Sequence, residues 1–220
     1  MQNSKTMQNW IKELTACNAC SLREEGNRGP TRYSGPIDSP ILIVGEGPGG
    51  VEDIYGVPLI GPSGQLLDKA LWSVKLTRDR IYVTNIVKCR PRSNRTPLDS
   101  EGRFCADKHL LKEIEVVQPK VIITLGKVAL HYFNNDEGAI TRMRGHWIDW
   151  NGIPVMPTYH PAYLLRLTGK EQVDAKWNMY YDLKAAVDKA KESAPDYEYC
   201  SKDAPNLLYT YESLKQSRQL

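Results

Sequence analysis

Hydrophobic positions along the chain alternate between short β-branched runs and longer stretches with helical spacing. The apolar runs predict strands over 41–44, 81–87, 121–125, 147–150 and 153–157, the last two joined at Asn151-Gly152 as a hairpin. Helical spacing predicts helices over 7–16, 65–74, 101–117, 126–132, 162–166 and 171–192. Strands that alternate with helices indicate an α/β fold. We expect a three-layer α/β/α sandwich around a central, mostly parallel, four-stranded sheet.

Two glycine clusters interrupt this pattern in the stretch 41–64. The first strand stops at Gly45, and glycines recur up to Gly50 and again from Gly56 to Gly64. Glycine lets a backbone approach a bound group closely, and ligands of open α/β sheets bind at the carboxyl ends of the strands. We therefore expect this stretch to form one wall of the active site.

The acidic residues of this stretch argue against a phosphate cradle. They are Glu46, Glu52 and Asp53. The pattern G-x-x-x-x-G-K-[ST], a usual signature of nucleotide-phosphate loops, does not occur in the stretch.

Composition adds only general limits. The 220 residues are 41% hydrophobic and 25% charged, and no apolar run approaches the ~20 residues that cross a bilayer. Without a signal-peptide pattern, the expectation is a cytoplasmic protein with no membrane partner. The net charge of +3 permits nucleic-acid binding without arguing for it. The regular pattern is lost over 193–220, which we interpret as an extension that is loosely ordered or docked on the domain.

Four of the five cysteines have spacings that indicate a metal site. Cys17 and Cys20 form C-x2-C, whereas Cys89 and Cys105 are separated by fifteen residues. In a cytoplasmic protein such pairs point to metal or redox chemistry, and four thiolates could hold zinc or a [4Fe–4S] cluster. Spacing alone does not separate the two metals. Unrelated small buried residues are the alternative, and Cys200 has no partner in the pattern.

Two polar residues at strand ends are candidates for chemistry. Asn85 offers a donor and an acceptor on one amide, although an Asn that caps a turn is the alternative. His160 precedes Pro161 at a strand-to-helix switch, where helix amides favour negative charge, so it could donate to a developing anion. A structural His on a turn is the alternative there.

A basic run follows the second strand. Lys88, Arg90, Arg92 and Arg95 lie within eight residues of one another. Such a run is usually a solvated loop, but its place at a strand exit would also allow it to follow DNA phosphates.

Five motifs in order, together with the four cysteines, resemble the family 4 uracil-DNA glycosylases, iron–sulfur enzymes of the uracil-DNA glycosylase superfamily. The motifs are GEGPGGVED, GVPLIGPSG, VTNIVKCRP, ITLG and YHPAYLLR, and the resemblance covers about residues 8–190. It implies a monofunctional glycosylase domain over 1–192 that flips deoxyuridine out of single- or double-stranded DNA and hydrolyses its N-glycosidic bond. Free uracil and an abasic site result, and base-excision repair begins.

The same resemblance implies a [4Fe–4S] cluster on the four cysteines, serving structure, in a monomeric enzyme. Two alternatives stay open. One is a protein on this scaffold that binds uracil or another lesion without turnover. The other is a metal-stabilised DNA-binding module.

Residue by residue, the resemblance assigns the following catalytic roles. Asn85 matches the asparagine that reads the O4 and N3 edge of uracil, and His160 matches the histidine that bonds O2 as the base departs. Glu46 and the backbone of Gly47 match the segment around the sugar and the hydrolytic water. Family 1 enzymes have a water-activating Asp where this chain has Gly47, so general-base catalysis does not transfer.

Further positions match substrate-binding residues. Glu52 matches an acid placed against C5, Leu164 the wedge that fills the vacated stack, and Arg166 a residue near phosphate. The family usually has Phe where this chain has Leu59, and that ring stacks on uracil. Base–aromatic stacking contributes ~1–3 kcal/mol, and Tyr55 is a candidate to supply the missing ring.

Overall fold

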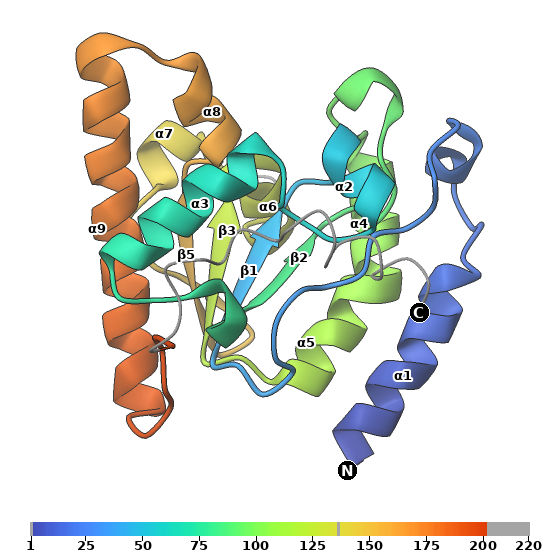
Figure 1. Cartoon of the computed structure of the whole chain (residues 1–220), viewed down its shortest axis with the longest axis horizontal. Coiled ribbons are helices and arrows are strands. Elements are labelled where there is room, and N and C mark those ends of the chain that lie inside the picture. Colours follow the sequence, from blue (N-terminus) through green and yellow to red (C-terminus); the bar gives the residue numbers. More distant parts are fainter. Residues whose placement is uncertain (1, 136, 202–220) are drawn as a thin grey trace.

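A five-stranded sheet forms the centre of the molecule in the computed structural model, which describes residues 2–135 and 137–201 (Figure 1). The strand order is β2 (Tyr82–Asn85), β1 (Ile41–Gly45), β3 (Val121–Leu125), β5 (Ile153–Thr158) and β4 (Ile148–Trp150). All neighbours are parallel except β4, which runs antiparallel to β5. The mostly parallel sheet is confirmed. It has five strands rather than four because the Asn151-Gly152 hairpin adds β4 as an edge strand.

Helices cover both faces of the sheet, so the α/β/α arrangement is also confirmed (Figure 1). One face carries α3 (Pro62–Ser73), α8 (Pro161–Arg166) and α9 (Gly169–Ser193). The other carries α1 (Gln2–Thr15), α4 (Asp99–Cys105), α5 (Leu111–Val117) and α6 (Gly126–Phe133). The short helices α2 (Gly50–Tyr55) and α7 (Ile140–Met143) lie in the connections.

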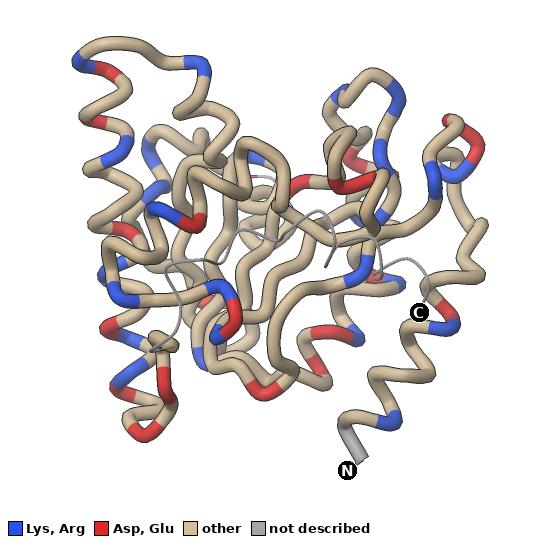
Figure 2. The backbone as a smooth tube through the Cα atoms, in the orientation of Figure 1, with Lys and Arg blue, Asp and Glu red and all other residues tan. Residues whose placement is uncertain are grey.

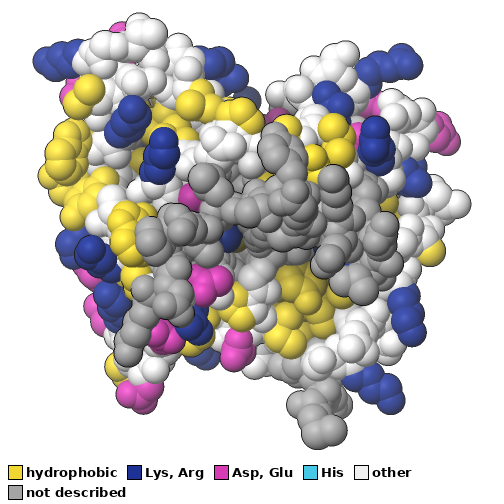
Figure 3. Space-filling view, viewed as in Figure 1, with side chains coloured by type: hydrophobic (Ala, Val, Ile, Leu, Met, Phe, Trp, Pro, Cys, Tyr) yellow, Lys and Arg dark blue, Asp and Glu magenta, His cyan; other side chains and the backbone are white. Residues whose placement is uncertain are grey.

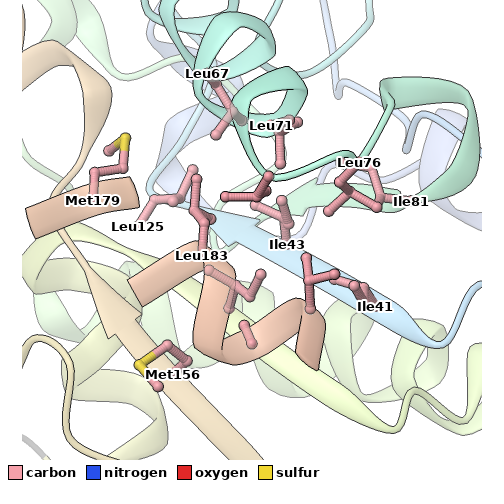
Figure 4. Close-up of a cluster of buried hydrophobic side chains, with 14 of the residues drawn as sticks. Ile41, Ile43, Leu67, Leu71, Leu76, Ile81, Leu125, Met156, Met179 and Leu183 are labelled. Carbon is pink, nitrogen blue, oxygen red and sulfur yellow. The ribbon is translucent and has the colours of Figure 1, made fainter. Parts of the chain in front are cut away.

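Successive side chains of β1 point to opposite faces of the sheet and pack into the hydrophobic core on each face. Ile41 and Ile43 belong to the hydrophobic cluster formed with α3 and α9, in which Figure 4 also labels Leu67, Leu71 and Leu183. The residues between them, Leu42 and Val44, pack on the opposite face with α1 and α6. The strand reads as a continuous apolar run because both of its faces are buried.

Several helices differ from the sequence prediction, which did not include the short α7 and began α3 at residue 65 instead of 62. The first begins at Gln2 rather than at residue 7. Residues 50–55 form α2, a helix that the sequence pattern did not predict because glycine clusters flank this segment. The helix predicted over 101–117 is interrupted, because the five residues Ala106–Leu110 form a π-helix between α4 and α5. π-Turns of this kind are found mostly at functional sites.

The chain beyond α9 returns to the domain as far as the structure describes it. Tyr199 is buried, its carbonyl accepts a hydrogen bond from Thr77 N at 3.1 Å, and Tyr197 Oη donates to the carbonyl of Arg80 at 2.8 Å. The predicted extension is therefore docked over its first residues. Residues 202–220 lie outside the described part, and a domain boundary at residue 192 stays a prediction. In the described parts of the chain, none of the helices has the length and apolar character needed to span a bilayer.

Candidate active site and candidate metal centre

Asn85 is a buried amide whose polar atoms have no protein partner. It is the last residue of β2, pairs in register with Gly45 of β1, and is only 2% exposed. Within the described residues, neither Oδ1 nor Nδ2 makes a hydrogen bond. An unpaired buried polar group costs roughly 1–3 kcal/mol, so native proteins rarely keep one without a use. This amide is therefore the leading candidate for binding a ligand that presents both a donor and an acceptor.

Glycine at position 45 is required by this amide. A Cβ added there would lie 2.4 Å from Asn85 Oδ1 and 3.5 Å from Leu59 Cδ1. Any larger residue would displace the amide. The two side chains that crowd this point, Asn85 and Leu59, therefore line the same corner at the carboxyl end of the sheet.

His160 lies at the N-cap of α8 with its protonation pattern fixed by the backbone. Its Nδ1 accepts a hydrogen bond from Ala162 N at 3.1 Å. Burial, together with the charge of Arg166, lowers the pKa of His160 to about 4. The ring is thus neutral near pH 7, and because Nδ1 is an acceptor, the proton is carried by Nε2. The site presents a neutral N–H donor.

Glu46 follows β1 directly and is half-buried. Burial raises the pKa of this carboxyl, and the positive charge of Arg166 opposes that rise. The charge of Arg166 on α8 therefore acts on both Glu46, which follows β1, and His160, which follows β5.

Position 47 has no space for a side chain. A Cβ added to Gly47 would lie 2.6 Å from Val87 Cγ2, which belongs to a fully buried side chain. A carboxylate at this position would require the segment after β2 to move. The structure thus gives a steric reason for glycine where family 1 enzymes have a water-activating Asp.

Glu52 joins the two glycine clusters. Its Oε2 accepts from Gly49 N at 3.1 Å, and its Oε1 accepts from Ile60 N at 3.0 Å and Gly61 N at 2.8 Å. Backbone donors occupy both oxygens, and the carboxylate at the first turn of α2 also suits the helix dipole. In this structure the Glu52 carboxylate holds the loop next to Leu59 in place. The contact with C5 stays a prediction.

Leu59 adopts a left-handed backbone conformation with φ of +52° and is 4% exposed. Its carbonyl accepts from Arg78 Nη2 at 2.7 Å, while Arg78 Nε donates to Asp68 Oδ1 at 2.8 Å. Sequence reasoning missed Arg78, and no motif would have revealed it. Tyr55 packs with a separate small cluster around Val57, whereas Leu59 belongs to the core cluster, and the role of Tyr55 as the missing ring stays a prediction.

Leu164, which the resemblance implies is the DNA wedge, does not lie at the surface in this structure. Leu164 is 0% exposed and packs in the core beneath α8. Neighbouring residues of a helix point in different directions, and here Leu165 (47% exposed) and Tyr163 (36%) project from the surface. A wedge must leave the protein surface to enter a base stack, so these two side chains are the candidates.

The four cysteines are neighbours in space. The pKa of Cys89 is raised to about 12 and that of Cys105 to about 11, chiefly by burial, and the charges of Cys17 and Cys20 contribute to both rises. Among residues 2–135 and 137–201, no three or more His, Cys, Asp or Glu side chains are arranged to hold a single metal ion. The thiols therefore gather from three segments of the chain without forming a single-ion cage.

Two hydrogen bonds orient these thiols. Lys88 N donates to Cys105 Sγ at 3.4 Å, and His109 Nε2 lies 3.3 Å from Cys17 Sγ. His109 is 2% exposed on the π-helix that follows Cys105. His109 follows Cys105 by four residues, a spacing that places two side chains on the same side of a helix, and the sequence prediction did not include it.

The basic run divides into paired and free members. Lys88 is 1% exposed and forms an ion pair with the fully buried Glu113. Arg95 pairs with Glu101 at 2.8 Å and also with Glu25. Of the four basic residues in this run, Arg90 and Arg92 form no ion pair among the described residues, although Arg90 Nε donates to Asn94 Oδ1 at 2.8 Å, so the phosphate-following interpretation applies to these two.

Comparison with known proteins agrees with this geometry. The family model described as the uracil DNA glycosylase superfamily matches residues 32–184. A type-4 uracil-DNA glycosylase of Thermotoga maritima is 42% identical over 163 residues, covering 73% of this chain and 82% of that protein. Proteins with the same description from Archaeoglobus fulgidus and Sulfurisphaera tokodaii are 34% and 36% identical, each over 70% of this chain, covering 81% and 73% of their own lengths. The chain belongs to the type-4 family of the uracil-DNA glycosylase superfamily.

Proposed function

We propose that this protein is a monofunctional uracil-DNA glycosylase that releases uracil from DNA and leaves an abasic site, so starting base-excision repair. The buried, unpaired amide of Asn85 carries the proposal, because uracil presents the complementary acceptor and donor. Membership of the type-4 family supports it.

Base recognition rests on the polarity of the Asn85 amide. Its Nδ2 donates to O4 of a flipped uracil, and its Oδ1 accepts from N3–H. Cytosine has a donor at N4 and an acceptor at N3, so both contacts become repulsive. A site that leaves buried polar groups unpaired against the wrong base discriminates strongly. The loop held by Glu52 faces C5 and excludes the methyl group of thymine in this proposal.

Stabilisation of the negative charge on the departing base accounts for the rate acceleration. His160 Nε2–H donates to O2 as negative charge grows on the departing base, and because the ring is neutral its proton stays in place. One such preorganised donor is worth about 2.7–4 kcal/mol, or roughly 10²–10³ in rate. Glu46 orients the water that adds to the electron-poor sugar. A dissociative path of this kind needs little nucleophile activation, which agrees with the closed space at Gly47.

DNA is held by the surface around α8. Leu165 and Tyr163 fill the space that the flipped nucleotide leaves, and Arg166 contacts a nearby phosphate. Extrusion costs a few kcal/mol and is least costly for mispaired or single-stranded uracil. Arg90 and Arg92 neutralise further phosphates on the opposite side of the site.

The four cysteines fit a [4Fe–4S] cluster. Each cysteine of such a cluster binds a different iron, so the thiols stand further apart than around one zinc ion. An apolar shell and the Lys88 N–H bond to Cys105 suit buried thiolates. The cluster would tie the end of α1, the exit of β2 and α4 together. Zinc is the alternative, and iron and sulfide analysis of anaerobically purified protein separates them.

An excision assay tests the proposal. Oligonucleotides with uracil in single-stranded, U·G and U·A contexts should each yield an abasic site that breaks only after alkali. Matched thymine and cytosine substrates should stay intact. Tight binding of uracil-containing DNA without turnover would identify a lesion-binding protein instead, and equal binding of all DNA without turnover would identify a DNA-binding module.

A further inference from the structure

Arg78 is a buried arginine that binds backbone carbonyl groups near the candidate active site. It begins the short 3₁₀ turn η2 (Arg78–Arg80), between α3 and β2, and is 2% exposed. Its Nη2 donates to the carbonyl of Leu59 at 2.7 Å and to that of Gly64 at 3.4 Å, while its Nε donates to Asp68 Oδ1 at 2.8 Å. A buried charge is costly unless it is paired and hydrogen-bonded. These contacts therefore give the guanidinium a defined place between α3 and the loop that contains Leu59.

The loop 56–61, which we call the pocket loop, is held by charged groups that lie outside it. It joins α2 to α3 and has no charged side chain of its own, as Figure 2 shows. Glu52 Oε1 accepts from Ile60 N at 3.0 Å, and Arg78 donates to the carbonyl of Leu59. That carbonyl and that N–H are the two ends of one planar peptide group. The carboxylate and the guanidinium therefore fix the same peptide plane from opposite ends.

Leu59 needs this support because its backbone has an unfavourable conformation. Its φ of +52° lies in the left-handed region, where a Cβ crowds the following carbonyl and residues other than Gly, Asn and Asp are uncommon. A return of Leu59 to a negative φ would move the peptide group that follows it and so break both hydrogen bonds at once. The first turn of α3 also stands close to this group, since a Cβ on Gly64 would lie 1.7 Å from the Leu59 carbonyl oxygen. The surroundings thus hold a strained residue, as is common at functional sites.

The side chain of Leu59 reaches the corner of the site that holds the Asn85 amide. A Cβ on Gly45 would lie 3.5 Å from Leu59 Cδ1 and 2.4 Å from Asn85 Oδ1, so both side chains approach the same point. Figure 3 shows the surface indented at its upper edge, between α8 and the lobe that carries α2. The pocket loop links the two sides, because it runs from α2 to α3, and α3 packs against α8. The conformation of this loop therefore determines where Leu59 stands relative to the amide.

We propose that Arg78 is a positioning residue of the base pocket, which sets the affinity for uracil by holding the peptide group between Leu59 and Ile60. Its guanidinium keeps the Leu59 side chain beside the Asn85 amide, where that side chain packs against the flipped base. The inference rests on the proposed function and adds to it a residue that lies outside every motif. A purely structural arginine would have a different effect, because its loss would lower the stability of the protein and leave the uracil affinity of the folded molecule unchanged.

Uracil binding to the full chain, measured by calorimetry alongside urea denaturation, tests the proposal. Arg78→Lys keeps a charge next to Asp68 but loses the planar fork that reaches the Leu59 carbonyl at the same time. It should weaken uracil binding about tenfold, which is within the range of coupling between residues in contact. Asp68→Asn is the matched control, because it removes the ion pair and keeps an acceptor for Arg78 Nε. It should lower the stability and leave the uracil affinity within about twofold.

A second variant makes the test independent of a buried lysine. Arg78→Gln/Asp68→Asn removes both charges together, so no carboxylate is left without its partner. Compared with Asp68→Asn alone, it should weaken uracil binding about tenfold. Leu59→Ala completes a double-mutant cycle. Because Arg78 acts through Leu59, Arg78→Lys should change the affinity by less than about twofold in that background.

The outcomes separate this inference from the proposed function. Unchanged uracil affinity in both Arg78 variants, whatever their stability, overturns the inference alone. A loss of about tenfold that persists in the Leu59→Ala background also overturns it, because the arginine then acts by another route. Unfolding of both Arg78 variants at room temperature, with Asp68→Asn still folded, would show a role in the whole fold and overturn one confined to the pocket. A wild-type chain that neither binds nor releases uracil overturns the proposed function, and this inference with it.

Discussion

Thr84 and Asn85 are adjacent on β2, yet their buried side chains have opposite fates. Thr84 Oγ1 donates to Glu113 Oε1 at 2.8 Å, and Lys88 Nζ donates to the same hydroxyl. Asn85 faces the other side of the sheet and has no partner in the described structure. The same strand therefore places a hydrogen-bonded polar group on one face of the sheet and an unpaired polar group on the opposite face.

This difference in hydrogen bonding distinguishes a polar group that stabilises the fold from one that is available to bind a ligand. Around Thr84, Glu113 also accepts from Tyr82 Oη at 2.9 Å and pairs with Lys88, so the polar network is internally satisfied. Such a network fixes the segment that leads to Cys89. The Asn85 amide is paired only when something enters the site. Burial is alike for the two residues, so hydrogen-bond pairing, rather than burial, distinguishes the binding group.

Glu113→Ala should produce the largest effect, on stability. It leaves the Lys88 ammonium buried without its carboxylate, which costs about 3–5 kcal/mol of unfolding free energy in comparable cases. Urea denaturation measures it. Glu13→Ala is the matched control, because Glu13 pairs with Lys112 at 2.6 Å on the surface and should lose less than about 1 kcal/mol. Similar losses in both variants would contradict the structural role of the buried pair.

Asn85→Ala should have the opposite profile. Single-turnover excision of uracil should fall by roughly 10²–10³, while the unfolding free energy changes by less than about 1 kcal/mol because no protein hydrogen bond is lost. Thr84→Val is the neighbouring control and should lower stability while leaving excision nearly unchanged. An Asn85→Ala enzyme that keeps its rate would remove the proposed base-reading role.

Leu59→Phe tests the pocket corner next to that amide. A ring stacked on uracil should strengthen inhibition by free uracil by ~1–3 kcal/mol. Leu59→Met, which adds length without a ring, should change it little. Because Leu59 is only 4% exposed, the ring must also be accommodated by neighbouring side chains. Equal or weaker inhibition would show that another group already fills the pocket.

The excision rate should depend on pH through the ionisation of the Glu46 carboxyl group. Burial raises its pKa, and the ionised form orients water, so the rate should fall by up to about tenfold per unit as pH drops through that raised value. His160, with a pKa of about 4, stays neutral over most of this range. Glu46→Gln should be slower and lose this acid limb. An unchanged limb in that variant would assign the titration to another group.

Sequence patterns predicted the strand ends well, because parallel strands bring their carboxyl termini to one edge. Asn85 and His160 could therefore be placed at one edge before the structure was known. The same patterns do not specify which side of a six-residue helix is buried, so the burial of Leu164 could not be predicted. Lys88 was taken for a surface cation because its chemistry suggests solvent, whereas its buried partner Glu113 is twenty-five residues away.

The loop contacts lay beyond sequence reasoning for a related reason. Glu52 binds backbone amides of residues 49, 60 and 61, and Arg78 binds the carbonyl of Leu59. Backbone groups have no identity in a sequence, so a side chain that serves them looks the same as one that serves a ligand. The hairpin was predicted, but its addition to the sheet as an edge strand required the tertiary arrangement.

The π-helix Ala106–Leu110 sets the helical phase between two otherwise unrelated features. Before it stands Cys105, and after it Glu113 points at Lys88 and Thr84. Each residue of a helix advances its direction by about 100°. If this turn wound as a regular α-helix with all its residues kept, Glu113 would rotate by about 100° relative to Cys105, because the π-turn absorbs one residue. The π-turn therefore compensates for one additional residue between Cys105 and Glu113, so that the thiol and the carboxylate both face their partners.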